Sequence, residues 1–425
     1  MRKLLHLCTV LFSTIILFSC DDSDDMMSTD MNMPVQGPDL MAYGLTANNE
    51  LVAFNANNPK MFTSKTAVTG VVSGEKLMSI DFRPATGELY ALSNASKLYI
   101  INTSNASARA VSTTAFSPAV SGTIASIDFN PTVDRIRLVS NTGQNLRLHP
   151  ETGAVAATDM NINGGGTPSV TGVAYTNSKS GASSTVLYDI DMTSGKLFKQ
   201  DPPNNGTLVE VGSLGTTFTG QAAFDIKYDN GAALLALNNN LHLLDLNTGK
   251  ATNIGMLQQQ IIDLAIPTEP VAYAVDNSNN LQIFNPNSPM PVSKAITGLQ
   301  TGESILGIDF RPLNGQLYAL GSSSRLYTIN LGTGAATAVG TSPFATLLAG
   351  TDFGFDFNPT DDKNRVVSNT EQNLRLDPVT GGITAADGML NPGTSMIGAA
   401  AYTNNFAGAT STTLFVIDHN TDKLY

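Results

Sequence analysis

An internal duplication constrains the fold of this chain more than any other feature of its sequence. Ile80–Pro84 recurs as Ile308–Pro312, and Asp128–Pro131 recurs as Asp356–Pro359. The two intervals are equal, because 309 − 81 and 356 − 128 are both 228. Since a repeat of fixed period reports the architecture directly, the body of the protein is predicted to contain two copies of one domain.

We assign residues 39–267 to the first domain, copy one, and residues 268–425 to the second, copy two. Copy two covers only part of the repeat. Its last residues, Asp422–Tyr425, align with Gly195–Phe198, after which copy one runs on for 69 residues (267 − 198). We interpret copy two either as a truncated product or as a shortened copy that closes differently.

Short apolar runs recur at intervals of roughly 35–50 residues within each copy, and turn residues separate them. In copy one the runs are Leu77–Phe82, Ile124–Phe129, Val170–Tyr175, Ala223–Tyr228 and Ile261–Ile266. Most are followed by a Pro/Gly/Asn turn and further short strands rich in β-branched and aromatic residues, without a sustained helical period. This pattern predicts an all-β fold made of four-stranded propeller blades.

Strand counting predicts how copy one closes. It opens with three strands, near Met41–Thr46, Leu51–Asn55 and Thr66–Val71, and it ends with the lone run Ile261–Ile266. That run can complete the first blade, which would seal a ring of about five blades. The alternative, a single ring over both copies, needs about nine blades, more than the usual 4–8. We therefore predict tandem β-propellers, the second of them incomplete.

The first residues form a predicted export signal. Residues 1–19 contain a cationic start and then an apolar run that is too short to span a bilayer. The ending Leu17–Cys20 resembles the lipobox of bacterial lipoproteins, which implies cleavage before Cys20 and acylation of its thiol. The alternative is an ordinary signal peptide whose cysteine is incidental.

Residues 20–38 are acidic, rich in Met and Pro, and without periodicity, which predicts a disordered tether. Four aspartates between positions 21 and 25 resemble the surface-export signal of some Gram-negative lipoproteins. A solvated linker without address information is the alternative. The expected location is therefore the cell envelope, with a lipid anchor in the outer membrane and surface exposure as the further possibility.

Composition excludes several function classes. The net charge is −12 and there is no cluster of Lys and Arg, so nucleic acid is not expected as a partner. The two cysteines, Cys8 and Cys20, precede the body, which therefore holds no disulfide, cysteine-bound metal or cysteine nucleophile. No known catalytic or phosphate-binding motif occurs, and we expect no cofactor.

One polar cluster is repeated in both copies and is the candidate site. In copy one it comprises Arg137, Asn141, Gln144, Asn145 and Arg147, and in copy two Arg365, Asn369, Gln372, Asn373 and Arg375. Two guanidinium groups beside amides can bind a carboxylate, a sugar or a peptide backbone. The structural alternative, which we favour, pairs each arginine with an aspartate of a neighbouring blade, for which Asp81 and Asp128 are candidates.

The stretch around this cluster also carries a family resemblance. Asp128–Pro131 and Arg135–Leu148, together with their copy-two equivalents, resemble a family of bacterial secreted proteins catalogued as domain of unknown function 4394. The resemblance covers nearly the whole body and implies a secreted, propeller-like domain. It implies no activity, substrate or catalytic residue.

Two functions fit these observations. The first is a lipid-anchored binding or scaffold module for an extracellular protein or glycan. The second is an envelope propeller hydrolase, similar to a lactonase, with a metal in the central channel. The repeated polar residues are mostly Arg, Asn and Gln rather than metal ligands, and His149 is replaced by Asp377 in copy two. Binding is therefore the favoured prediction.

Overall fold

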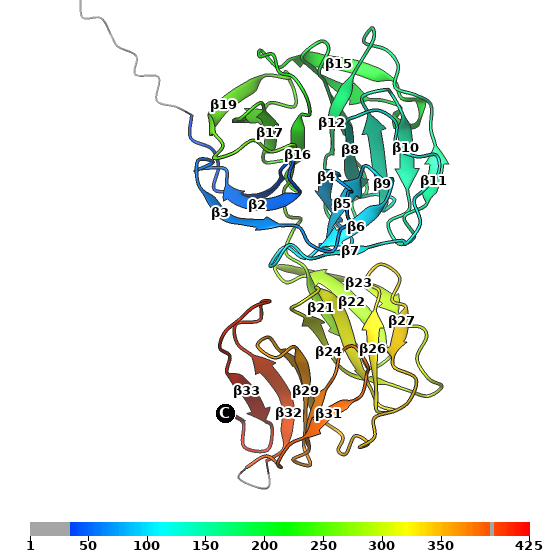
Figure 1. The fold of residues 1–425 in the computed structure, drawn as a ribbon, viewed down its shortest axis with the longest axis vertical. Helices are drawn as coiled ribbons and strands as arrows, with labels where there is room; N and C mark the ends of the chain where they lie inside the picture. Colours follow the sequence, from blue (N-terminus) through cyan, green and yellow to red (C-terminus); the bar gives the residue numbers. More distant parts are fainter. Residues whose placement is uncertain (1–34, 392–394) are drawn as a thin grey trace, which may run out of the picture. The chain divides into compact units, whose positions relative to one another are not determined.

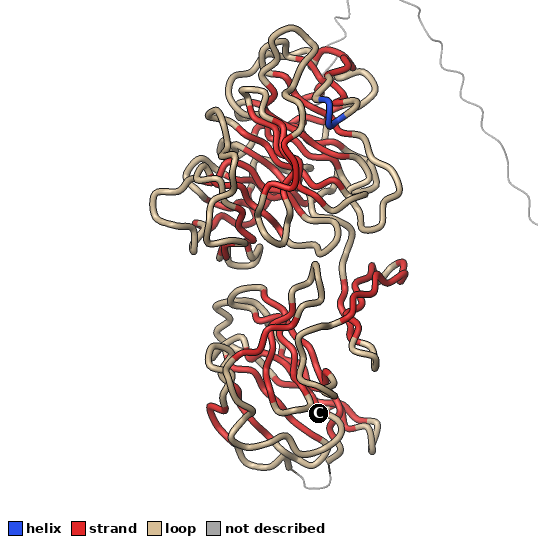
Figure 2. The backbone as a smooth tube through the Cα atoms, turned by 90° about the vertical axis from the view of Figure 1, so that its right-hand side faces the viewer, coloured by secondary structure: helices blue, strands red, loops and turns tan. Residues whose placement is uncertain are grey.

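The computed structural model describes residues 35–391 and 395–425, and this part of the chain is all-β except for the single-turn 3-10 helix η1 (Pro203–Asn205) (Figure 2). The predicted signal, Cys20 and the tether up to residue 34 lie outside the described residues. Packing begins at Gly37, inside the predicted tether, where a Cβ would lie 2.0 Å from the carbonyl oxygen of Ala56. No helix in the described part is long and apolar enough to cross a membrane.

Copy one contains five four-stranded antiparallel sheets, the predicted blades. Blade one has the strand order β20-β1-β2-β3, formed by β1 (Met41–Leu45), β2 (Glu50–Asn55), β3 (Phe62–Ala67) and β20 (Asp263–Ala265). Blade two consists of β4 (Leu77–Phe82), β5 (Leu89–Ser93), β6 (Leu98–Ile101) and β7 (Ala108–Ala110). Blade three consists of β8 (Ala125–Asn130), β9 (Arg135–Ser140), β10 (Asn145–Leu148) and β11 (Val155–Thr158).

The remaining two blades of copy one have the same meander order. Blade four consists of β12 (Val170–Tyr175), β13 (Leu187–Asp191), β14 (Lys196–Gln200) and β15 (Leu208–Ser213). Blade five consists of β16 (Ala223–Ile226), β17 (Ala233–Leu237), β18 (Asn240–Leu244) and β19 (Ala251–Met256). The first strand of each blade from two to five, and β20 in blade one, is the inner strand.

Copy two contains four sheets, two of them three-stranded. The first is β21 (Ala272–Val275), β22 (Asn280–Asn285) and β23 (Ser288–Ala295), and the second is β24 (Ile305–Arg311), β25 (Gln316–Gly321), β26 (Arg325–Ile329) and β27 (Ala336–Val339). The third is β28 (Phe353–Asn358), β29 (Lys363–Ser368), β30 (Asn373–Leu376) and β31 (Ile383–Ala386). The fourth is β32 (Ile397–Tyr402), β33 (Leu414–Asp418) and β34 (Lys423–Leu424).

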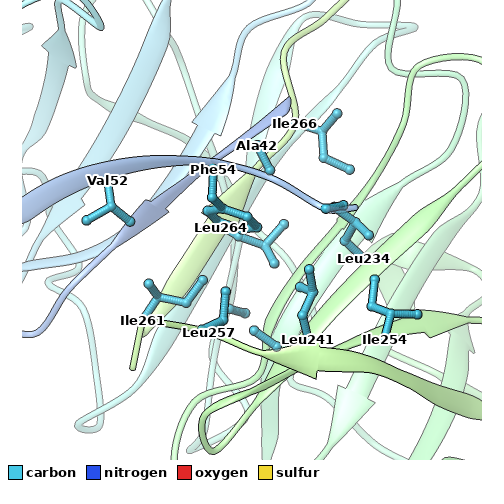
Figure 3. Close-up of a cluster of buried hydrophobic side chains, with 13 residues drawn as sticks. Ala42, Val52, Phe54, Leu234, Leu241, Ile254, Leu257, Ile261, Leu264 and Ile266 are labelled. Atoms are coloured by element: carbon cyan, nitrogen blue, oxygen red, sulfur yellow. The ribbon is translucent and has the colours of Figure 1, made fainter. Parts of the chain in front are cut away.

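The ring of copy one closes through β20, as predicted. This strand pairs antiparallel with β1, with Tyr43 opposite Ala265 and Leu45 opposite Asp263. Figure 1 shows the first strands of the chain beside the last strands of copy one, and Figure 3 shows the core at this junction. There Phe54 and Leu264 from blade one share a buried cluster with Leu234 and Leu241 from blade five (Figure 3).

Local turn chemistry explains why the strands end where they do. Gly87, between the first two strands of blade two, has φ of +70°, and its repeat Gly315 has φ of +65°. Glycine adopts this left-handed conformation without steric cost, so each hairpin turns sharply.

The prediction of tandem propellers with an incomplete second ring is confirmed. One predicted strand, Thr66–Val71, is displaced, since β3 begins at Phe62.

Candidate functional site

Four aspartates converge on the axis of copy one. Asp81, Asp128, Asp225 and Asp263 lie on four of the five inner strands and are almost completely buried. Each inner strand is the edge of its sheet, so its outward N–H groups have no partner within the blade. We call these four residues the clip aspartates, because each one binds the neighbouring inner strand.

The bonds made by the clip aspartates run from blade to blade around the ring. The N–H of Phe129 donates to Asp81 at 2.7 Å, that of Tyr175 to Asp128 at 3.0 Å, that of Ile266 to Asp225 at 2.6 Å, and that of Ile80 to Asp263 at 2.9 Å. Ser79 and Ser126 extend the pattern, since their hydroxyl oxygens accept from Ile127 and Val173 at 2.9 and 3.1 Å. Each buried edge group thereby gains a partner, which avoids a cost of about 1–3 kcal/mol per unsatisfied group.

Blades four and five are joined by a hydrogen bond between two backbone groups, with no aspartate or serine side chain in it. There the N–H of Ala222 donates to the backbone carbonyl of Thr171 at 3.3 Å. Gln221 also reaches across the ring from this position and donates to the carbonyl of Met78 at 2.8 Å. Direct polar contacts therefore connect all five neighbouring pairs of blades.

Burial shifts the acidity of this cluster. It raises the pKa of Asp225 to about 7 and that of Asp263 to about 8. Burial, and then the nearby carboxyl groups of Asp225 and Asp81 respectively, raise the pKa values of Asp81 and Asp128 well above the ordinary range. Burial thus favours the protonated form of these four carboxyl groups more than it is favoured in exposed aspartates.

The same cluster has metal-ligand geometry. One carboxylate oxygen from each of Asp81, Asp128 and Asp225 lies within 4.8 Å of the others. Carboxylate oxygens are ligands for hard divalent cations. All three side chains already accept N–H bonds from a neighbouring inner strand, however, so ring closure explains their positions without a metal. Asp81 and Asp128 were predicted only as partners for arginine, and their convergence on the axis was not predicted.

The predicted polar cluster forms a connected network around Arg137 on β9. Its side chain is 2% exposed and contacts Asp159 at 2.6 Å. It also donates to Asn145 at 2.7 Å, to Asn204 at 2.8 Å and to the hydroxyl of Tyr175 at 3.3 Å. Since Asn204 and Tyr175 belong to blade four, Arg137 connects blades three and four. Its acidic partner, Asp159, follows β11 of its own blade, so the expected pairing with an aspartate of a neighbouring blade is wrong. Of the two named candidates, Asp81 lies in blade two, and Asp128 lies on β8 in the same blade as Arg137.

Arg147 shares the same acidic partner but lies nearer the solvent. Its Nε and Nη2 atoms both contact Asp159 at 2.9 Å, and its side chain is 35% exposed. The hairpin-tip amides brace a loop: Asn141 accepts from the N–H of Thr123 at 3.2 Å, and Gln144 accepts from that of Ser121 at 2.9 Å. All five candidate residues of copy one therefore form hydrogen bonds or ion pairs with other residues of the protein.

Copy two repeats this network in a more open setting. Arg365 contacts Asp387 and Asn373, both at 2.6 Å, and Arg375 donates twice to Asp387 at 2.9 Å. The tip is braced as well, since Gln372 accepts from Ala349 at 2.9 Å and Asn369 accepts from Thr351 at 3.0 Å. The side chain of Arg365 is 15% exposed, and the bond to Asn204 has no counterpart in the described residues of copy two.

Comparison with known proteins assigns the chain to a family. A model of the family described as domain of unknown function (DUF4394) matches residues 50–265 and 280–425, which means both copies. The chain belongs to this family. No curated protein matches it.

Two solved structures resemble this DUF4394 member at low identity. The structure of dihydro-heme d1 dehydrogenase NirN in complex with DHE is 10% identical, with 91% of this chain and 72% of that chain covered and a TM-score of 0.26. The structure of the Dos1 propeller is 13% identical, with 76% and 85% covered and a TM-score of 0.30. At these values neither structure supports an argument about function.

One buried acidic residue of this DUF4394 member was not predicted from the sequence. Asp189 on β13 lies opposite Val173 and Phe198 in blade four, and neither of its carboxylate oxygens has a hydrogen-bond partner. Burial raises its pKa to about 8. Copy two has Val416 at this position, so the carboxyl group is a feature of copy one alone. An acid inside an apolar strand run was the available signal.

Proposed function

We propose that this protein is a lipid-anchored binding or scaffold module of the cell envelope, which engages an extracellular protein or glycan. One observation carries the proposal: the polar side chains that converge in copy one bind neighbouring blades. Both the clip aspartates and the Arg137 network hold blades together instead of presenting free reactive groups. Such cross-bracing stiffens a platform whose loops are free to carry binding residues.

The envelope location rests on the first twenty residues. A cationic start, an apolar run and Cys20 fit a lipoprotein signal, and the thiol-free body fits a protein that needs no redox protection after export. A lipid anchor with several acyl chains gives stable membrane attachment, whereas a single chain gives only marginal binding. The proposed site is the outer membrane, with the propellers extended beyond it on the acidic tether.

Cell fractionation tests the anchor. Cys20→Ala should move the protein from the membrane fraction to the soluble fraction, while Cys8→Ala, a matched change within the signal, should leave it membrane-bound. Metabolic labelling with a fatty-acid analogue should mark the parent chain and not the Cys20→Ala variant. Unchanged partitioning of Cys20→Ala would rule out acylation at this residue.

Ligand screening tests the binding role. The soluble Cys20→Ala protein should show saturable binding on arrays of extracellular glycans and peptides, and the binding should survive EDTA. Dependence on a divalent cation would instead favour the second candidate.

That second candidate, a metal-dependent hydrolase, is favoured by the convergence of Asp81, Asp128 and Asp225. Calorimetric titration with Ca²⁺, Mn²⁺ and Zn²⁺, followed by assays on a lactone panel, tests it. Stoichiometric binding and hydrolysis that are both lost in Asp128→Asn would replace the scaffold proposal. Asp128→Asn is a sharp probe because the amide oxygen can still accept the hydrogen bond from Tyr175.

A further inference from the structure

An ion-pair network fills the junction between blades two and three of copy one. Arg83, which directly follows β4, is 1% exposed and donates from Nε to Asp134 at 2.8 Å. It also contacts Glu151 and donates to the hydroxyl of Tyr90 at 3.3 Å. We call these four residues the Arg83 network. One guanidinium group thus lies between the two blades and is balanced by two carboxylates of blade three.

Strand register identifies the equivalent positions in blades two and four. In both blades the last residue of the inner strand pairs with the first residue of the second strand. The next residue after the inner strand is Arg83 in blade two and Thr176 in blade four. The second residue of the second strand is Tyr90 in blade two and Tyr188 in blade four. Blade four therefore keeps the tyrosine and lacks the arginine.

Blades three and five correspond in the same way. Their first hairpins are equally long between the last matched strand pairs, and Gly231 stands at the position of Asp134. The third residue after the third strand is Glu151 in blade three and Asn247 in blade five. Neither of the carboxylates that balance Arg83 is therefore present at its equivalent position in blade five.

A cavity of about 390 Å³ lies between blades four and five at this place. Its wall includes the counterparts of all four members of the Arg83 network: Thr176, Tyr188, Gly231 and Asn247. The short side chain of Thr176 and the missing side chain of Gly231 leave open the volume that Arg83 and Asp134 fill at the other junction. The cavity is thus a consequence of specific replacements between two otherwise equivalent junctions.

Hydrogen-bonding groups with spare capacity face this cavity. The hydroxyl of Tyr188 makes no hydrogen bond in the described part of the chain, whereas that of Tyr90 accepts from Arg83. Asn230, on the cavity wall, is fixed by two hydrogen bonds with Asn177, of 2.8 and 2.6 Å. Its amide nitrogen keeps one further N–H for a ligand. The cavity therefore presents donors and acceptors that the protein already holds in place.

The charge of the lining indicates the class of ligand. The lining contains no Lys or Arg, and its single carboxylate, Asp245, accepts the N–H of Asn247 and the hydroxyl of Thr248, both at 2.8 Å. A guanidinium group here would lack the two carboxylates that balance Arg83, and an anion would meet Asp245 without a cation. Leu244 adds an apolar wall. Amide, hydroxyl and aliphatic groups together suit an uncharged ligand rich in hydroxyl groups.

We propose that the cavity between blades four and five is a carbohydrate site for a neutral mono- or disaccharide unit. The inference rests on the proposed binding function and names the ligand class and its place on the protein. The sugar hydroxyls donate to Tyr188 and Asp245 and accept from the amides of Asn230 and Asn247. An apolar edge of the sugar ring lies against Leu244.

Calorimetric titration of the full chain carrying Cys20→Ala tests the proposal, with the neutral disaccharides cellobiose, lactose, maltose and diacetylchitobiose as probes. We expect saturable binding of at least one probe at a single site. Tyr188→Phe should weaken this binding at least ~10-fold, because it removes a hydroxyl that the ligand uses. The same change should leave the melting temperature unchanged, since that hydroxyl makes no hydrogen bond within the described residues.

Matched variants show whether the effect belongs to this cavity. Tyr90→Phe removes the equivalent hydroxyl from the filled junction, so it should lower the melting temperature slightly and leave saccharide binding unchanged. Thr176→Arg combined with Asn247→Glu rebuilds part of the Arg83 network inside the cavity. This double variant should remain folded and lose saccharide binding.

Two outcomes would overturn the proposal. If no probe binds, the cavity is not a site for neutral saccharides, even where the protein binds peptides. If a probe binds and Tyr188→Phe binds it equally well, the saccharide lies elsewhere on the protein. In both cases the proposed binding function can still hold through another surface, so failure of this site is distinguishable from failure of that function.

Discussion

The inner strands of copy one and copy two carry nearly the same residues and meet very different surroundings. All six residues of β4 are buried, whereas the first six of β24 are only half-buried. Burial raises the pKa of Asp309 to about 6, while that of its counterpart Asp81 lies well above the ordinary range. The local sequence places an aspartate on the axis in both copies. Closure of the ring determines how far burial raises the pKa of that aspartate.

The largest expected difference between the copies is their resistance to proteolysis. Limited digestion should cleave copy two first and leave a fragment of about residues 39–267, because cleavage of a folded domain requires local opening and copy two has an exposed face and an unpaired edge. Mass spectrometry of a digestion time course measures this. Equal survival of both halves would show that copy two is as stable as the closed ring.

Removing the central arginine of each network should lower the free energy of unfolding more in copy one than in copy two. Arg137→Ala removes the buried contacts of this side chain to Asn145 and Asn204 and leaves Asp159 bound to Arg147 alone. Breaking a buried pair costs about 3–5 kcal/mol. Arg365→Ala should cost less, since Arg365 and Asp387 are more exposed. Urea unfolding of both variants measures the difference.

Arg147→Ala is the matched control for that experiment, because Arg137 continues to hold Asp159 after the change. A partly exposed pair contributes about 0–1 kcal/mol. A loss for Arg147→Ala as large as that for Arg137→Ala would show that the outer arginine, and not the buried one, stabilises the junction.

Stability should also depend on pH more steeply in copy one. The folded pKa values of Asp225 and Asp263, about 7 and about 8, lie above the ordinary value of about 3.9. Their contribution is complete below about pH 4 and is lost as the pH rises through the folded values. Copy two has lower values, about 6 for Asp309 and about 7 for Asp356, so its loss should be smaller and end at lower pH.

Hydrogen exchange at several pH values separates the two copies in this test. Asp263→Asn should flatten the pH dependence of copy one, since the amide oxygen can still accept from Ile80 and Ser79 but no longer titrates. A copy one that grows more stable between about pH 5 and pH 8 would contradict the assigned direction.

A smaller effect than that of Arg137→Ala is expected from exchanging one residue between the copies. Asp189→Val, which installs the residue of copy two, should stabilise copy one by about 1–2 kcal/mol, because it removes a buried carboxyl group without a partner. The reverse change, Val416→Asp, should cost less than Asp189→Val gains, since Val416 is only half-buried. Thermal unfolding of both variants checks this, and a destabilised Asp189→Val protein would reveal a favourable contact of the acid.

Much of the fold could be predicted because its determinants are local. Gly87 and Gly315 mark hairpin turns through a backbone conformation that glycine adopts freely, and the alternating apolar runs mark strands. The lone run Ile261–Ile266 predicted ring closure by strand counting alone. The site was harder, because the polar atoms of Arg137 meet Asp159 and Asn204 through two separate hairpins.

The sequence by itself determined the duplication, the strand pattern, the blade number of copy one and the repeated polar cluster. Only the tertiary structure decided which groups meet across the ring, such as Asp263 with Ile80, which are 183 residues apart. The physical reason is that an inner strand has unpaired N–H groups wherever its sheet ends. The partner of each such group is set by which strand lies beside it in space, and the order of residues along one strand does not contain that information.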